Sequence, residues 1–103
     1  MSSGVSYDFE WDVAKAISNF AKHGVTFERA ATVFLDPLAI TVFDHAHSLM
    51  EERWFTVGQQ SGGELLVVVH TFQDRSSDVA RVRIISARTA TKQERRTYED
   101  EPR

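Results

Sequence analysis

Apolar residues in the first third of the chain recur at the spacing of an amphipathic helix. After Asp12, a good helix N-cap, five of them fall on one helical face: Val13, Ala16, Ile17, Phe20 and Ala21. The opposite face carries polar residues: Lys15, Ser18, Asn19 and Lys22. Gly24 suits the left-handed position that ends the helix, and Thr26 can cap a second helix that Asp36-Pro37 ends. The pattern predicts two short helices, each with one apolar face to bury.

Further along the chain the pattern changes to the period of two that is typical of strands. Four segments rich in β-branched and aromatic residues are expected strands: residues 38–43, 53–59, 64–72 and 79–87. Ser61-Gly62-Gly63 predicts a hairpin turn and residues 74–78 a second polar connection, which together favour an antiparallel meander. The alternation in the last strand places Ala80, Val82, Ile84 and Ser86 on one side and Arg81, Arg83, Ile85 and Ala87 on the other.

Thr91 and Glu94 have the spacing of a capping box, which predicts a C-terminal helix. That helix has little apolar surface beyond Tyr98, so we expect it to be lightly docked. At 103 residues the chain has the length of one domain, expected over residues 1–103. The expected fold is α+β: two N-terminal helices packed on a four-stranded antiparallel sheet, with a short C-terminal helix.

Composition excludes several kinds of chemistry. The chain has no cysteine, which rules out disulfides, thiolate metal sites and cysteine catalysis. No apolar run approaches the roughly 20 residues needed to span a bilayer. The first six residues lack the basic and apolar parts of a secretion signal, so we expect a cytoplasmic protein.

Basic residues are concentrated near the end of a chain whose net charge is −3. Between residues 81 and 96 only Glu94 is acidic, and six residues are basic: Arg81, Arg83, Arg88, Lys92, Arg95 and Arg96. Arg81 and Arg83 would lie about 7 Å apart on one strand face, a spacing that suits adjacent phosphates. Lys92 and Arg95 share a face of the last helix, and Arg88 is expected at the hinge before it. The cluster predicts a grip on an RNA backbone; the alternative is a solvated charged surface.

Three further places carry candidate chemistry. Lys22-His23 offers a cation and an imidazole for proton transfer, although cations also favour helix C-termini for electrostatic reasons. Glu52 is a candidate general base or a structural partner of an arginine. Asp44-His45-Ala46-His47 contains metal-ligand residue types, but it lies in a loop without a helical histidine pair, so no metal site is predicted. His70, in an apolar strand, is expected to be a core or sheet-face residue.

Taken together, these motifs resemble the BrnT family of toxins over roughly residues 9–98. The opening resemblance lies in Phe9-Glu10-Trp11-Asp12, Lys15, Asn19, Lys22-His23-Gly24-Val25, Phe27-Glu28 and Ala30. The middle contributes Asp36-Pro37, Glu51-Glu52-Arg53, Val57-Gly58 and Leu66-Val67-Val68-Val69. The most specific part is the close: Arg83-Ile84-Ile85-Ser86-Ala87-Arg88, Ala90, Glu94-Arg95 and Tyr98. Leu49-Met50 departs from the small polar residues expected there and would expose apolar surface to an antitoxin.

The resemblance implies a metal-independent ribonuclease toxin of a type II toxin–antitoxin system, with a fold similar to the RelE toxins. Such a protein inhibits translation by cutting RNA, and its partner would resemble the ribbon–helix–helix BrnA antitoxins, through which the complex binds operator DNA. The expected roles are Arg83 and Arg53 as transition-state clamps and Lys22 or His23 in proton transfer, with Glu52 as the competing base. Arg81, Arg88, Lys92 and Arg95 would hold flanking phosphates.

Two other functions remain open from the sequence. A non-catalytic interaction protein would use the same basic face to dock an acidic partner or to join a DNA-bound complex. A metal hydrolase using His45 and His47 is the third alternative, and chelation would test it.

Overall fold

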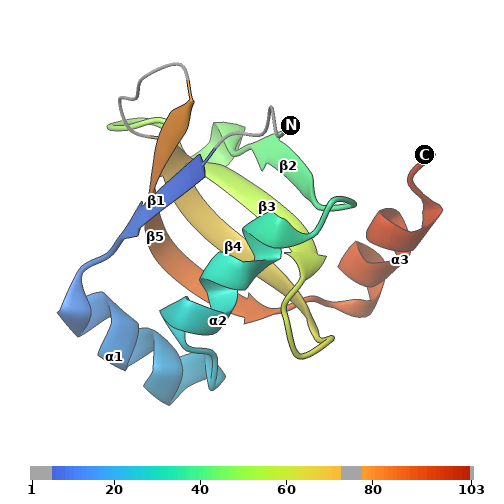
Figure 1. Cartoon of the computed structure of the whole chain (residues 1–103), viewed down its shortest axis with the longest axis horizontal. Coiled ribbons are helices and arrows are strands. Elements are labelled where there is room, and N and C mark those ends of the chain that lie inside the picture. The colour runs from blue at the N-terminus through green and yellow to red at the C-terminus, as the bar shows by residue number, and fades with distance from the viewer. Residues whose placement is uncertain (1–5, 73–77, 103) are drawn as a thin grey trace.

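The computed structural model describes residues 6–72 and 78–102 (Figure 1). Two helices follow the first strand, and a third helix follows the last strand. The elements in chain order are β1 (Ser6–Glu10), α1 (Val13–His23), α2 (Phe27–Ala31), the 3-10 turn η1 (Thr32–Leu35), β2 (Ile40–Phe43), the 3-10 turn η2 (His45–His47), β3 (Trp54–Gln59), β4 (Leu65–Phe72), β5 (Val79–Thr89) and α3 (Lys92–Asp100). The predicted connection at residues 74–78 lies almost wholly outside the described residues.

The sheet has five strands in the order β1-β5-β4-β3-β2. Strands β2 to β5 form the predicted antiparallel meander, but β1 adds to the edge of β5 in parallel. The prediction of four antiparallel strands was therefore wrong in strand number and in being purely antiparallel. Tyr7 and Phe9 lie on one side of β1, with ring centroids 5.4 and 5.3 Å from that of Phe34, and this apolar contact fixes the strand.

The predicted helix starts, and the predicted end of α1, are confirmed by their caps, whereas α2 ends at Ala31 and the chain continues as the 3-10 turn η1 up to Leu35, just before Asp36-Pro37. The Asp12 side chain accepts a hydrogen bond from Lys15 N at 3.2 Å, and Thr26 accepts one from Arg29 N at 3.1 Å. Gly24 takes a left-handed φ of 70° and its N–H donates to Phe20 O. The capping box that opens α3 is also present. No helix within residues 6–72 and 78–102 is long and apolar enough to cross a membrane.

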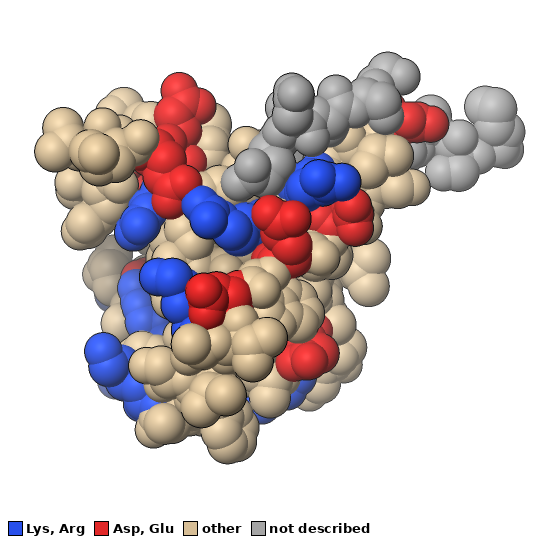
Figure 2. Space-filling model, turned by 90° about the vertical axis from the view of Figure 1, so that its left-hand side faces the viewer, with Lys and Arg blue, Asp and Glu red and all other residues tan. Residues whose placement is uncertain are grey.

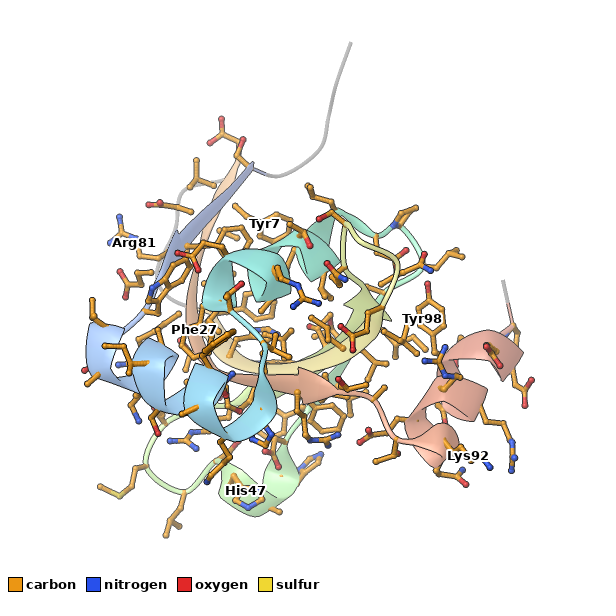
Figure 3. All side chains as sticks on the ribbon, turned by 90° about the horizontal axis from the view of Figure 1, so that it is seen from below. Tyr7, Phe27, His47, Arg81, Lys92 and Tyr98 are labelled. Carbon is orange, nitrogen blue, oxygen red and sulfur yellow. The ribbon has the colours of Figure 1, made fainter. Side chains whose placement is uncertain are left out.

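The main core lies between α2 and one face of the sheet. Buried residues of the helical segment, led by Phe27 and Val33, pack against the inward side chains of the central strands: Leu66, Val68, Val82 and Ile84. A smaller cluster on the other face holds Val57, Leu65 and Val67, with Tyr98 of α3 packed against it. Figure 3 shows α2 on one side of the sheet and the loop that carries His47 on the other. The second face is only partly covered.

Helix α1 packs on the sheet through the side that carries Asn19. Ala16 of the predicted apolar stripe contacts the main core, but most of the stripe is exposed, which contradicts the prediction that it is buried. Val13, Ile17 and Phe20 are 69%, 67% and 54% exposed, whereas Asn19 is buried. Asn19 Nδ2 donates to Val25 O at 3.1 Å and to Ala87 O at 2.9 Å. Asn19 Oδ1 accepts from Ala87 N at 3.1 Å.

The orientation of α1 is explained by the edge of strand β5 on which the helix packs. The pairing with β1 ends at Glu10 and Arg83, so the same edge of β5 lacks a strand partner at Ala87. The amide of Asn19 takes both backbone bonds that a neighbouring strand would have made there. A buried polar group that satisfies buried backbone groups determines which face of α1 turns inward.

A register shift in β5 also changes which side chains face the open side of the sheet. Val69 pairs with Ser86 and His70 with Ile84, so Ile85 is an extra residue at this point. Beyond it the predicted alternation is wrong. Ala87 is in the main core, whereas Ser86 and Arg88 face the same side as Arg83.

His70 is a core residue, as predicted. It is fully buried, and its Nε2 lies 2.8 Å from Thr56 Oγ1. Thr56 Oγ1 is in turn 2.8 Å from Thr41 Oγ1 on the next strand. Burial lowers the pKa of His70 from 6.5 to about 4, partly opposed by a backbone hydrogen bond at Thr71.

This pKa makes stability depend on pH. As the pH falls from 6.5 to about 4, the unfolded chain binds a proton at His70 before the folded chain does. The free energy of unfolding should therefore fall by about 1 kcal/mol per pH unit from this residue alone, and the loss ends below about pH 4. In urea titrations between pH 7.5 and 4.5, His70→Gln should show a shallower decline than the wild type. His45→Gln, at an exposed position, is the matched control, and parallel curves for wild type and His70→Gln would contradict the expectation.

Candidate active site

Three adjoining cavities lie on the open face of the sheet and meet at Ile85 of β5. The first, of about 380 Å³, lies between β5 and the η2 loop and is lined by Asp44, His47, Arg53, Arg88 and Glu94 among others. The second, of about 350 Å³, lies against α1 and is lined by Lys15, Lys22 and His23. The third, of about 220 Å³, is lined by Asp12, Lys15, Glu51, Arg53 and Arg83. Ser86 borders the first two cavities, Arg53 the first and third, and Lys15 the second and third.

Arg83 and Arg53 share one carboxylate at the floor of the third cavity. Arg83 Nη2 donates to Glu51 Oε2 at 2.5 Å, and Arg53 Nε lies 3.8 Å from Glu51 Oε1. The side chains of Arg53 and Arg83 are 34% and 39% exposed, so both are only partly buried. The two arginines that the sequence predicted as clamps are thus brought together.

The acidic residue at this point differs from the predicted one. Glu51 lines the third cavity, whereas Glu52 is exposed and lines none of the three. Glu51 lies in a bend shortly before β3, and its side chain, not that of the exposed Glu52, is turned toward the arginines. The sequence Glu51-Glu52-Arg53 did not indicate which of the two faces the arginines.

Helix α1 contributes the other cations. Lys15 and Lys22, seven residues apart, share the helical face that holds buried Asn19, and His23 follows at the helix end. The hydrogen bonds from Asn19 to β5 therefore hold this face beside Ser86 and Ile85. Lys15 was missed as a site residue, although its place in line with Asn19 and Lys22 on the polar face of the helix was a usable signal.

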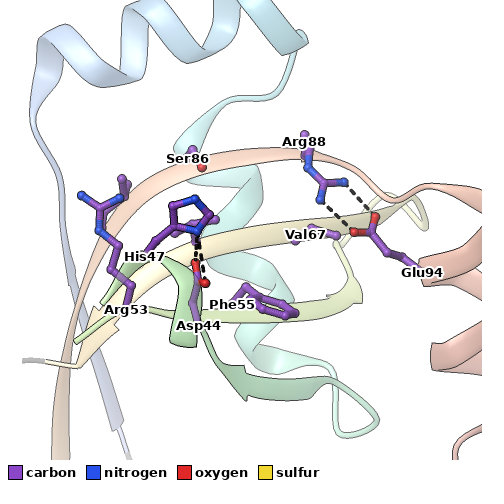
Figure 4. Close-up of a pocket in the computed structure, with 10 residues that line it drawn as sticks. Asp44, His47, Arg53, Phe55, Val67, Ser86, Arg88 and Glu94 are labelled. Atoms are coloured by element: carbon purple, nitrogen blue, oxygen red, sulfur yellow. Dashed lines mark hydrogen bonds and ion pairs between the residues drawn. The ribbon is translucent and has the colours of Figure 1, made fainter. Parts of the chain in front are cut away.

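Arg88 is engaged by the last helix. It lies within β5 rather than at the predicted hinge, and its two terminal nitrogens donate to the two oxygens of Glu94, each at 2.8 Å (Figure 4). The hydrogen bond from Arg88 lowers the pKa of Glu94 to about 2, and the same bond raises the pKa of Arg88. Tyr98 also donates to Asp36 Oδ2 at 2.7 Å. These two contacts, together with the packing of Tyr98 on the smaller apolar cluster, dock α3 on the rest of the domain.

The predicted basic cluster from Arg81 to Arg96 does not converge in space. Figure 3 shows Arg81 and Lys92 at opposite sides of the molecule. Arg81 Nη2 lies 3.4 Å from Asp8 Oδ2 on β1, and Lys92 and Arg95 are exposed on α3. Figure 2, which views the side that lies on the left in Figure 1, shows basic side chains interleaved with acidic ones. The cations that do converge come from α1, the segment before β3, and β5.

Comparison with known proteins identifies the family. A family model described as "Ribonuclease toxin, BrnT, of type II toxin-antitoxin system" matches residues 11–94. The chain belongs to the BrnT family. The family suggested by the sequence motifs is thereby confirmed, together with the toxin, ribonuclease and toxin–antitoxin classes.

A solved structure supports the fold of this BrnT chain. This chain is similar to the crystal structure of the ribonuclease toxin BrnT of Brucella abortus, with a TM-score of 0.58 and 22% sequence identity. The match covers 85% of this chain and 100% of the other chain. No curated protein matches the sequence. The likeness at this identity establishes a shared α+β fold.

The side chains of the loop Asp44-His45-Ala46-His47 make contacts within the loop and with β2 in this BrnT chain. Within residues 6–72 and 78–102, no three or more histidine and acidic side chains are grouped to hold a metal ion. His47 is instead bonded to the carboxylate of Asp44, and the ring of His45 packs on Phe43 with centroids 4.7 Å apart. Leu49 and Met50 in the same loop are almost fully exposed, as their sequence suggested.

Proposed function

We propose that this chain is an endoribonuclease toxin that acts in the cytoplasm and inhibits translation by cutting RNA. The observation that carries the proposal is the convergence of Lys15, Arg53 and Arg83 on joined cavities around Ile85. Cations held by separate elements around a cleft can stabilise a phosphate whose charge increases during reaction. Membership of a ribonuclease toxin family supplies the reaction class.

The proposed reaction is attack of the RNA 2′-hydroxyl on the neighbouring phosphorus. The new 2′-O–P bond forms, the P–O5′ bond breaks, and the products are a 2′,3′-cyclic phosphate and a 5′-hydroxyl. Arg83 and Arg53 would bind the non-bridging oxygens. Glu51 would position the two guanidiniums, and because each arginine has five donors, donors remain for the phosphate. Such charge stabilisation supports a metal-independent reaction.

Lys22 or His23 would donate the proton to the leaving 5′-oxygen. Both line the second cavity, which adjoins the arginines through Lys15 and Ile85. Glu52 is less well supported as a base because it is exposed outside the three cavities. Arg81, Arg88, Lys92 and Arg95 would contact flanking phosphates, and Arg88 would have to exchange its bond to Glu94 to do so.

The partner proposed for this toxin is a small BrnA-like ribbon–helix–helix antitoxin. The type II toxin–antitoxin family implies an antitoxin, and the resemblance in sequence motifs suggests its kind. The complex would bind operator DNA through the antitoxin. Growth arrest on expression, relieved by co-expression of the adjacent open reading frame, is the expected genetic result.

Incubation of purified protein with RNA in EDTA tests the proposed reaction. We expect cleavage to persist in the chelator and the fragments to carry 2′,3′-cyclic phosphate and 5′-hydroxyl ends, because the nucleophile belongs to the RNA. End-group analysis by phosphatase and kinase treatment distinguishes these ends from 5′-phosphates. Loss of activity in EDTA would contradict metal independence. Folded protein that cuts no RNA, with or without ribosomes, would favour the non-catalytic interaction protein.

A further inference from the structure

The η2 loop places an imidazole and a carboxylate together beside the arginines. His47 Nδ1 lies 3.2 and 3.1 Å from Asp44 Oδ1 and Oδ2. Both residues line the first cavity, together with Arg53, Ser86 and Arg88. We propose that His47 is the general base of RNA cleavage and that Asp44 is its positioning residue, an inference that rests on the proposed ribonuclease function.

The hydrogen bond determines which ring nitrogen is available. An ionised carboxylate only accepts hydrogen bonds, so Nδ1, which faces Asp44, carries the proton. The lone pair of a neutral ring is then on Nε2. Figure 4 shows His47 projecting from the η2 loop toward β5, with its bonded nitrogen directed at Asp44 and the other nitrogen on the far side of the ring. Nε2 is therefore presented to the cavity as a proton acceptor.

The loop is built to hold this pair. Asp44 N donates to Arg53 O at 2.8 Å, which closes the loop at its base. The Ser48 hydroxyl donates to Asp44 O and accepts from Arg53 N at 3.0 Å. The side chain of Asp44 is 14% exposed, whereas that of His47 is 70% exposed. The positioning group is shielded and the reacting group is open, which is the arrangement that a base acting on a bound polymer needs.

The pair of Asp44 and His47, called the dyad below, adds a second proton-transfer group, at a different end of the site from Lys22 and His23. In-line displacement needs a base at the attacking 2′-oxygen and an acid at the leaving 5′-oxygen, on opposite sides of phosphorus. His47 borders the first cavity and Lys22 and His23 the second, and the two cavities meet at Ile85 and Ser86. The 2′-hydroxyl proton would pass to His47 Nε2, and O5′ would receive its proton from Lys22 or His23.

A surface ion pair is the competing explanation, and the kinetics of His47→Gln separate the two. As base, His47 accepts the proton of the 2′-hydroxyl, so kcat should decline on the acidic limb of the pH profile. The charged groups around the cavities are Asp44, Glu51, Arg53, Arg88 and Glu94. We expect His47→Gln to lower kcat about 100-fold or more and to abolish this acidic limb. Asp44→Asn should lower kcat while the limb persists. His45→Gln in the same loop should match the wild type in rate and profile.

The outcomes are distinguishable. Thermal melting checks that each variant is folded. If the wild type cleaves RNA and His47→Gln keeps its kcat and pH profile, the dyad proposal is overturned and the proposed function stands. If the folded wild type does not cleave RNA, both proposals fall.

Discussion

Asn19→Leu is expected to lower the free energy of unfolding by on the order of 3 kcal/mol, a large fraction of the roughly 5–15 kcal/mol typical of a small domain. The leucine fills a similar volume but leaves Val25 O, Ala87 O and Ala87 N without the bonds that the amide makes. Each buried backbone group left unpaired costs about 1–3 kcal/mol. Urea unfolding followed by circular dichroism measures the change.

Ser18→Ala is the matched control for this experiment. Ser18 is exposed, adjacent in sequence and in the same helix, so its replacement should change the free energy of unfolding by less than about 0.5 kcal/mol. Equal urea midpoints for Asn19→Leu and the wild type would show that the amide does not hold α1 on β5. The placement of Lys15 and Lys22 beside Ser86 would then need another cause.

The behaviour of Asn19 shows what sequence periodicity could and could not predict. Capping residues and apolar spacing located α1 correctly, because these are local properties of the chain. Which face of α1 turns inward depends on β1 ending opposite Arg83, which leaves Ala87 of β5 without a strand partner on that edge. The missing strand partner at Ala87 is a property of the sheet, and no residue pattern within residues 13–23 indicates it.

The strand prediction was also partly correct, because it located four strands but missed β1 and the extra residue in β5. Alternation found the four antiparallel strands, but β1 is short, largely exposed and at the edge, where little burial shapes its sequence. The extra residue Ile85 also has no marker, since two consecutive isoleucines fit a strand buried on both faces equally well. Its consequence is large, because it turns Ser86 and Arg88 to the side of Arg83.

The candidate site was predicted in part for the same reason. Arg53, Arg83, Lys22 and His23 were chosen from residue type and family resemblance, and all four border the joined cavities. Lys92 and Arg95 were chosen because they share a basic face of the helix that follows the basic strand. Both are exposed and line none of the three cavities, whereas Glu94 of the same helix lines the first. The pairing of Asp44 with His47 depends on loop closure by Ser48, and residue type alone suggested only metal ligands.

Arg83→Ala is expected to reduce kcat for RNA cleavage by about 100- to 1,000-fold, the usual effect of removing one donor that binds a developing oxyanion. Its loss also leaves Glu51 with Arg53 as its remaining ion-pair partner, at 3.8 Å, so the negative charge of the carboxylate is less compensated and repels an incoming phosphate more strongly. Arg83→Lys should recover only part of the activity, because a lysine keeps the charge but not the two-pronged donor geometry. Single-turnover assays with saturating enzyme isolate the cleavage step from RNA binding.

Arg81→Ala is the internal comparison, because Arg81 is on the same strand two residues earlier and is held by Asp8 outside the three cavities. Its replacement should raise KM a few-fold at most and leave kcat unchanged, as expected of a residue that contacts a flanking phosphate. Equal kcat values for Arg83→Ala and the wild type, in protein with unchanged melting temperature, would remove Arg83 from the chemistry. Lys15 and Arg53, which line the cavities around Ile85, would then be assigned to RNA binding alone.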